Sequence, residues 1–290
     1  MPQPLLLTDA PHLLYRGFYA LPDSITDADG VPVNALLGSV NQVLQVVEDR
    51  NPRAVVMCFG EEAADYRVEA YPEYHAHRPP MPDGLAAQWE RAGPLYEALG
   101  WSVDSYPGLE ADDLLHSLAA VEADAGGSVL ILTGDRDMFQ CATDRVHVLL
   151  QRAASRDRPA GHDEMGPEEV QERYGVPPAA VPDFIALRGD PSDGLPGAKG
   201  IGPKTAADLL KRHGTLEAAI KGAVREKPSV RRALLEQADE LRAFSDIATL
   251  RRVDVPRPPD APLDHERGAE AAAALGMNRL AERLRHWGRG

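Results

Sequence analysis

Short apolar runs alternate with longer segments of helical periodicity through the first half of the chain. The apolar runs cover residues 5–9, 54–59, 102–106, 129–133 and 146–151. Helical spacing of apolar residues is clear between them, for example at 34–50 and 84–99. Continuous apolar runs of this length are typical of strands buried on both faces of a parallel sheet. The pattern predicts an α/β fold with a central, mostly parallel sheet flanked by helices.

The second half changes character, since no strand-like run of comparable strength follows Gln151. Helices are expected at 167–174, 179–188, about 200–213, 216–221, 229–250 and 270–287. We therefore divide the chain into an α/β region, residues 1–165, and an all-helical region, residues 166–290. The proline-rich stretch 255–264 is expected to be a surface connection. The polar, aromatic stretch 66–80 is expected to leave the core.

Composition narrows the class of protein. The 290 residues include 43% hydrophobic and 26% charged side chains, which is typical of a globular chain, and the net charge is −14. That charge argues against a protein that coats nucleic acid with its whole surface. It also leaves an excess of carboxylates, which a metal site would use as ligands. Cys58 and Cys141 are expected to be reduced and structural. With no signal peptide or membrane anchor at the N-terminus, we expect a cytoplasmic protein.

Acidic residues gather at Glu110, Asp112 and Asp113, where a helix with a leucine stripe is expected to begin. Glu110 and Asp113 are three residues apart and so share a helix face. Acidic side chains favour the positive end of a helix, so simple capping is one interpretation. Three carboxylates within four residues repel one another, however, and such a cluster is costly unless cations neutralise it.

Other carboxylates follow the predicted strands. Asp9 and Asp135 fall at the carboxyl edge, where open α/β sheets place their sites, although one such aspartate alone would be only a turn former. Eight carboxylates come from four segments: Asp9, Glu110, Asp112, Asp113, Asp135, Asp137, Asp190 and Asp193. Oxygen ligands of this kind suit a pair of Mg²⁺ or Mn²⁺ ions, which can support phosphodiester hydrolysis. No zinc-like Cys/His spacing and no Ser/His/Asp set compete with this interpretation.

A basic island surrounds the turn formed by Gly200, Gly202, Lys204 and Thr205. Glycines let a backbone approach a ligand closely, and a helix N-terminus offers free N–H groups to phosphate. The basic residues around it are Lys199, Lys204, Lys211, Arg212, His213, Lys221, Arg225, Lys227, Arg231 and Arg232. The island predicts contact with a phosphate backbone, and the alternative is an ordinary helix turn with solvated charges.

With these motifs assembled, the chain resembles the bacterial 5′ nuclease (flap endonuclease) family. The first matching stretches are Leu7-Thr8-Asp9, Leu14-Tyr15-Arg16, residues 71–82 and Glu110-Ala111-Asp112-Asp113. The later ones are residues 133–138, 189–197 and 200–206. They follow the family's order over nearly the whole chain, and the combination is specific although each alone is weak. The resemblance implies a PIN-like 5′ nuclease fold, here as a stand-alone protein because no polymerase region follows Gly290.

The resemblance also assigns roles to residues. It implies a first metal site at Asp9, Glu110, Asp112 and Asp113, and a second at Asp135, Asp137, Asp190 and Asp193. Asp112 or Asp113 could be shared between the two sites. It further implies a helical arch at about 71–93 over a 5′ single strand. A helix–three-turn–helix element at about 189–213 would grip duplex DNA and bind K⁺. Residues matching substrate-binding positions are Arg16, Arg67, Tyr74, His75, Arg78, Gly200, Gly202, Lys204 and Thr205.

Two positions depart from the family's pattern. Gly60 stands where the family usually has aspartate after the second strand, so Glu61, Glu62 or a water would have to replace that ligand. We expect Gly60→Asp to tighten metal binding. His75 stands where the arch usually has lysine, and a neutral imidazole would stabilise phosphate less at pH 7. Together these predict weaker or more Mn²⁺-dependent activity.

The predicted function is therefore a two-metal 5′ nuclease, both flap endonuclease and 5′–3′ exonuclease, in DNA replication and repair and in RNA primer removal. Its expected partner is DNA with a 5′ flap, nick or gap, or an RNA–DNA hybrid, and we expect a monomer without membrane contact. One alternative is a structure-specific DNA-binding protein whose catalysis has weakened. Another is a nuclease acting chiefly on RNA.

Overall fold

A six-stranded sheet forms the centre of the protein. The computed structural model describes residues 3–153 and 158–287. The strands are β1 (Leu5–Asp9), β2 (Ala54–Phe59), β3 (Ser102–Ser105), β4 (Val129–Thr133), β5 (Val146–Arg152) and β6 (Gly161–Met165). Their order across the sheet is β3-β2-β1-β4-β5-β6, and β6 pairs antiparallel with β5 while the other neighbours are parallel. The predicted α/β fold with a mostly parallel sheet is confirmed.

The apolar runs form strands because the central strands are buried on both faces. Leu5, Leu6 and Leu7 of β1 are fully buried. Successive side chains point to opposite faces, so Leu5 and Leu7 join one apolar layer and Leu6 joins the other. Leu7 lies opposite Val56 of β2 and Ile131 of β4, which fixes the parallel register.

Strand order creates a crevice at the carboxyl edge of the sheet. The chain runs outward from β1 to β2 and β3, and then returns to place β4 on the other side of β1. Connections diverge at such a reversal and leave a crevice outside the carboxyl ends of the two strands. Asp9 ends β1 and Thr133 ends β4, so both border this crevice.

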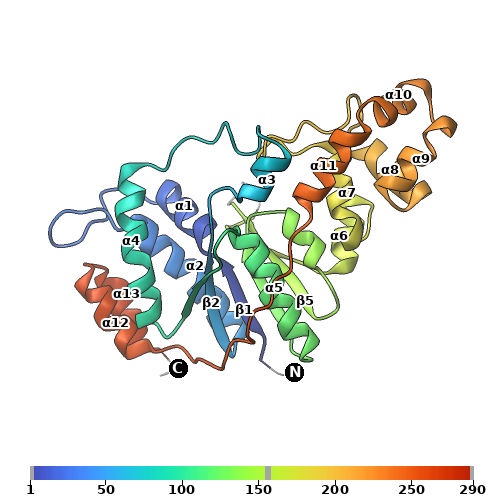
Figure 1. The fold of residues 1–290 in the computed structure, drawn as a ribbon. Helices are drawn as coiled ribbons and strands as arrows, with labels where there is room; N and C mark the ends of the chain where they lie inside the picture. The colour runs from blue at the N-terminus through green and yellow to red at the C-terminus, as the bar shows by residue number, and fades with distance from the viewer. Residues whose placement is uncertain (1–2, 154–157, 288–290) are drawn as a thin grey trace.

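Helices cover both faces of the sheet (Figure 1). One face carries α1 (Ala10–Ala20), α2 (Asn34–Arg50), α4 (Asp83–Ala98), α12 (His265–Ala274) and α13 (Asn278–Arg285). The other carries α5 (Ala111–Asp124), the 3₁₀ helix η1 (Asp137–Cys141), α6 (Pro167–Tyr174), η2 (Pro178–Ala180) and α7 (Val181–Arg188). The remaining helices are α3 (Asp65–Ala70), α8 (Pro203–His213), α9 (Leu216–Lys221), η3 (Ala223–Arg225), α10 (Pro228–Glu236) and α11 (Ala238–Ala248). Helices α8, α9 and α10 project beyond the sheet at the upper right of Figure 1.

Three elements differ from the sequence prediction. The expected helix 229–250 is two helices, because the backbone turns at Gln237, whose side chain accepts a hydrogen bond from the Lys199 amide. The expected helix 270–287 is also two, divided near Gly276, whose φ of +72° favours glycine. Strand β6 was not expected, because its sequence is polar; it pairs along β5 and adds an Arg152–Asp163 ion pair.

The last two helices return to the α/β core. They lie beside α4 in Figure 1, and Ala269, Met277 and Leu280 join the apolar layer that also contains residues of α2 and α4. Arg283 of α13 pairs with Glu48 of α2 at 2.8 Å. The expected helical region, residues 166–290, includes these two helices, whereas they pack against the region 1–165.

The segment expected to form the first part of a helical arch has little regular structure. Residues 71–82, all of them described, form turns rather than a helix, and the helix α4 begins at Asp83. The segment does not leave the core along its whole length, since Tyr74 and His75 are buried.

Across residues 3–153 and 158–287, no helix combines the length and the apolar character that crossing a bilayer requires.

Candidate active site

Two strand ends bring the first carboxylates together. Asp9 ends β1 and caps α1, where its Oδ1 accepts a hydrogen bond from the His12 amide at 3.0 Å. Its Oδ2 accepts one from the Thr133 hydroxyl at the end of β4, at 2.7 Å. Asp135 lies two residues further on, and its own amide donates to Thr133 Oγ1 at 3.0 Å. The two aspartates therefore share one hydroxyl across the crevice between β1 and β4.

Glu110 does not cap its own helix. It occupies the N-cap position of α5, but its side chain makes no capping hydrogen bond there. Instead, Oε1 accepts from the Ala64 amide and from Arg67, both at 2.9 Å, and Oε2 accepts from the Tyr74 hydroxyl at 3.0 Å. The capping interpretation is wrong for this residue, whose carboxylate is held by groups on the approach to α4.

Asp113 is a buried support rather than a free ligand. It is fully buried, and the Arg67 guanidinium donates to both of its oxygens at 3.0 and 3.1 Å. The Tyr66 hydroxyl at 3.1 Å and the Arg251 amide at 2.8 Å also donate to it. These donors occupy both oxygens of a carboxylate that is fully buried, whereas Glu110, also bonded through both oxygens, is 8% exposed. The contacts therefore lend no support to Asp113 as a metal ligand, and that role stays a prediction.

Asp112 lies between the two groups of carboxylates. Burial raises its pKa well above the ordinary value, and the negative charge of Asp135 raises it further. The charges of Asp9 and Glu110 act in the same direction, while Arg67 opposes them. Asp112 thus interacts with carboxylates of both predicted metal groups, as a shared ligand would.

The second group is held by two loops. The Asp135 side chain accepts from the Asp137 amide at 2.8 Å. Burial, with repulsion from Asp193, raises the pKa of Asp135 to about 7. Burial and the charge of Asp135 also raise the pKa of Asp137 well above its ordinary value. Asp190 and Asp193 complete the group from the loop after α7, where Asp190 accepts from Arg188 at 3.0 Å.

The donor chemistry fits divalent cations. Burial raises the pKa values of Asp112, Asp135 and Asp137 most, and the charges of neighbouring carboxylates raise them further. A divalent cation would offset both effects, because it stabilises the ionised carboxylates. Oxygen ligands of this kind suit Mg²⁺ or Mn²⁺, which also retain bound waters. Within residues 3–153 and 158–287, no three His, Cys, Asp or Glu side chains are arranged as a ready cage for an ion. The fit therefore rests on charge and donor type.

Gly60 allows a close contact with α5. A Cβ on this residue would lie 2.8 Å from Glu110 Cα, and closer still to the Glu110 carbonyl carbon and the Ala111 amide nitrogen. An aspartate cannot enter this space without moving the start of α5. This close packing does not favour the prediction that Gly60→Asp tightens metal binding. Glu61 and Glu62, the expected replacements for an aspartate at this position, are both exposed.

Three of the expected substrate-binding residues face inward. Arg67 is only 3% exposed, and its guanidinium donates to Glu110, to Asp113 and to the Ile247 carbonyl. Tyr74 is buried with its hydroxyl on Glu110. Because their polar groups are bonded to the protein, these contacts do not favour the predicted substrate binding by either side chain, which stays a prediction.

His75 is also buried, contrary to the expected exposure. Its ring stacks on Tyr74 with the ring centroids 3.8 Å apart. Its Nδ1 lies 2.8 Å from the Glu62 carbonyl, and its Nε2 lies 3.2 Å from Asp193. His75 therefore supports Asp193 instead of facing the solvent.

The other expected substrate-binding residues remain accessible. Arg78 is 40% exposed and donates to Asp193 at 3.1 Å, while Arg16 donates to the Arg152 carbonyl at 3.0 Å. Gly200 and Gly202 are exposed before α8, with open space where a side chain would be. Lys204 is exposed and Thr205 is half-buried in the first turn of α8. Their contacts with DNA stay predictions.

Several supporting residues were not predicted. Tyr66, Thr133 and Gln140 hold the carboxylates or the loops that carry them, through a hydroxyl or an amide. Thr133 could have been suspected, because it ends a strand directly before Gly134-Asp135. Tyr66 and Gln140 meet their partners only in the folded chain.

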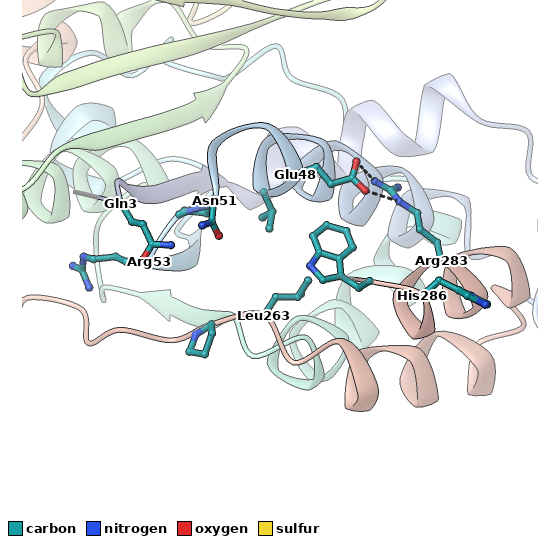
Figure 2. Close-up of a pocket in the computed structure, with 11 residues that line it drawn as sticks. Gln3, Glu48, Asn51, Arg53, Leu263, Arg283 and His286 are labelled. Carbon is teal, nitrogen blue, oxygen red and sulfur yellow. Dashed lines mark hydrogen bonds and ion pairs between the residues drawn. The ribbon is translucent and has the colours of Figure 1, made fainter. Parts of the chain in front are cut away.

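A cavity of about 690 Å³ lies away from these residues. Gln3, Asn51, Arg53 and Trp287 are among the residues that line it (Figure 2). Gln3 precedes β1, and Asn51 precedes β2, so the cavity is at the amino edge of the sheet. It therefore takes no part in the carboxylate site.

Family models match two consecutive parts of the chain. A family model described as 5′-3′ exonuclease, N-terminal resolvase-like domain, matches residues 4–175, and one described as 5′-3′ exonuclease, C-terminal SAM fold, matches residues 176–265. The 5′-3′ exonuclease of Mycobacterium tuberculosis is 34% identical over 316 residues, which cover 98% of this chain and 97% of the relative. Thermostable DNA polymerase I of Thermus thermophilus is 39% identical over 281 residues, covering 97% of this chain. The chain spans about a third of that polymerase's length, 32%.

Solved structures share the fold. The T5 D15 protein co-crystallised with metal ions has a TM-score of 0.69 at 17% identity, covering 97% of both chains. The catalytic core of Rad2 in complex with DNA substrate has a TM-score of 0.64 at 12% identity, covering 97% of this chain and 90% of the other. Structural neighbours of this kind are thus known with divalent metal ions and with DNA. From its two matched domains and its full-length relative, the chain belongs to the 5′-3′ exonuclease family.

Proposed function

We propose that this protein is a metal-dependent 5′ nuclease that cuts 5′ flaps and removes nucleotides from the 5′ ends of DNA, or of RNA primers on DNA. The observation that carries the proposal is the gathering of carboxylates at the carboxyl edge of the sheet, where Asp9 and Asp135 are both hydrogen-bonded to the Thr133 hydroxyl and Asp112 lies in the first turn of α5. Family membership supports the same reaction. The preferred substrates would be flapped, nicked or gapped duplexes, and the protein would act as a monomer in DNA replication and repair.

The metals proposed are two Mg²⁺ or Mn²⁺ ions. Asp9, Glu110 and Asp112 would hold the first, and Asp135, Asp137, Asp190 and Asp193 the second, with Asp112 shared. Bound there, such a pair supplies Lewis-acid chemistry for in-line phosphodiester hydrolysis. The protein's own contribution is to fix the carboxylates through Thr133, Arg67, Tyr74 and His75.

The helix α8 is the proposed duplex-binding element. Its N-terminus is exposed, and the glycines before it leave room for a phosphate to approach the backbone. Lys204 and its basic neighbours would add attraction for the duplex. A K⁺ ion bound at the helix–three-turn–helix element, residues 189–213, belongs to this proposal, as does contact of Arg78 with the substrate phosphates. Free, buried Cys58 and Cys141 suit a reducing compartment, the cytoplasm.

A labelled 5′-flap duplex tests the proposal. We expect cleavage near the junction with Mg²⁺ or Mn²⁺, and loss of at least 10²-fold in rate for Asp135→Asn, because that residue would hold a metal. Binding without cleavage in either metal would contradict the enzyme and support a DNA-binding protein with weakened catalysis. Faster cleavage of an all-RNA flap strand would favour a ribonuclease.

A further inference from the structure

The carbonyl end of α11 touches the supports of both carboxylate groups. We define residues 247–251, where α11 ends and the following connection begins, as the docking segment. On one side, Arg67 Nε donates to the Ile247 carbonyl at 3.0 Å, and the Arg251 amide donates to Asp113 at 2.8 Å. Arg67 in turn holds Glu110 at 2.9 Å. The docking segment is thus two interactions away from the first metal group.

On the other side, Gln140 makes an equivalent link. Its amide nitrogen donates to the Ala248 carbonyl and to the Asp137 carbonyl, both at 2.9 Å. Its amide oxygen accepts from the Leu250 amide at 3.0 Å. Because Gln140 is in η1, which begins at Asp137, the same docking segment reaches the second metal group.

Burial and ring contacts hold the docking segment and its partners in place. Ile247, Ala248 and Leu250 are buried, so the segment is packed as well as hydrogen-bonded. Arg67 lies 4.9 Å from the centre of the Tyr66 ring, and Arg251 lies 3.3 Å from the same ring. Few rearrangements are open to a buried guanidinium between two carboxylates and an aromatic ring, because any displaced charge would be left unpaired.

The docking segment also belongs to the region that would bind DNA. Helix α11 packs along α7, which leads into the loop of Asp190 and Asp193 and then into α8. We propose that the docking segment, through Arg67 and Gln140, positions the two carboxylate groups relative to each other and to the duplex-binding helices. Arg67 and Gln140 are then positioning residues rather than DNA contacts. This inference rests on the proposed function, since it names what aligns that site.

Two variants test the inference, with a third as control. Arg67→Gln and Gln140→Leu each remove one link, whereas Arg242→Gln removes an exposed arginine of α11 that pairs with Glu217 and Asp239. For the first two, we expect kcat and Mn²⁺ affinity by calorimetry to fall about tenfold or more, as for residues behind metal ligands. KM and the affinity for flap DNA in Ca²⁺ should stay unchanged. The control should match the parent protein in every measurement.

Other outcomes would overturn the inference. If Arg67→Gln weakens DNA binding in Ca²⁺ and flattens its salt dependence, Arg67 contacts a phosphate instead. If both variants lose only thermal stability, with kcat and Mn²⁺ affinity intact, the links are merely structural. Should Arg67→Gln fail to fold, Gln140→Leu decides alone. Should the parent protein not cleave flaps, the proposed function fails, and Mn²⁺ affinity still decides whether these residues position the carboxylates.

Discussion

At the scale of single residues, partners rather than residue types decide how far each carboxylate is enclosed by the protein. Asp112 and Asp113 are adjacent and chemically identical. Asp113 is enclosed by Arg67, Tyr66 and a backbone amide, whereas Asp112 is left facing other negative charges. The sequence predicted the acidic group as a whole, from spacing and charge repulsion. It could not separate the two aspartates, because their partners come from segments 46 and 138 residues away.

Gly60 leads to a residue-scale prediction about packing. Gly60→Asp should lower the free energy of unfolding by about 1–3 kcal/mol, because the new side chain collides with the backbone at Glu110 and Ala111. Metal affinity should fall with it, since Glu110 is displaced. Urea denaturation and Mn²⁺ calorimetry measure the two effects.

Gly93→Ala is the matched control for this change. Gly93 is inside α4, and no atom lies within 4 Å of the position of an added Cβ. Alanine there should raise stability by about 0.5–1 kcal/mol, because it favours the helix. If Gly60→Asp instead tightens metal binding at unchanged stability, the space beside α5 is open and the packing argument is wrong.

The raised pKa of Asp135 predicts a pH dependence for the metal-free protein. A carboxyl whose pKa rises from 3.8 to about 7 on folding binds its proton more tightly in the folded state. Its contribution to stability is therefore present at low pH and is lost as pH rises from about 4 through about 7. In EDTA, Asp135→Asn should be more stable than the parent at pH 8, and this advantage should shrink towards pH 5. Parallel stability curves for the two proteins between pH 5 and 8 would contradict the raised pKa of Asp135.

At the scale of elements, apolar periodicity was a reliable guide where burial is two-sided and a poor one at edges. Strands β1, β2 and β4 are buried and apolar, so their limits were readable from sequence. Strand β6 is polar because it lies at the sheet's edge, where backbone pairing and ion pairs replace apolar burial. Breaks between helices occur at local backbone features, such as the positive φ of Gly276, and the spacing of apolar residues does not predict them. The docking of α12 and α13 on α4 depends on tertiary packing and left no local signal.

At the scale of the whole molecule, an acidic protein has to bind an acidic polymer. The net charge of −14 opposes approach of DNA at low salt, and the carboxylate site adds to this repulsion until cations occupy it. Exposed basic side chains on α8, α9 and α10 lie on the part of the molecule that projects beyond the sheet (Figure 1). Binding therefore depends on where charge is placed, more than on its total.

Lys204 tests the placement of charge directly. Lys204→Gln should weaken DNA binding and reduce the slope of log affinity against log salt by about one, because one phosphate contact is lost. The rate at saturating DNA should stay unchanged, since Lys204 is in α8 and away from the carboxylates. Arg285→Gln is the matched control: it makes the same change in net charge on the exposed surface of α13, on the opposite side of the sheet. Equal losses of affinity in the two variants would mean that total charge governs DNA binding. The proposal that α8 contacts the duplex would then be contradicted.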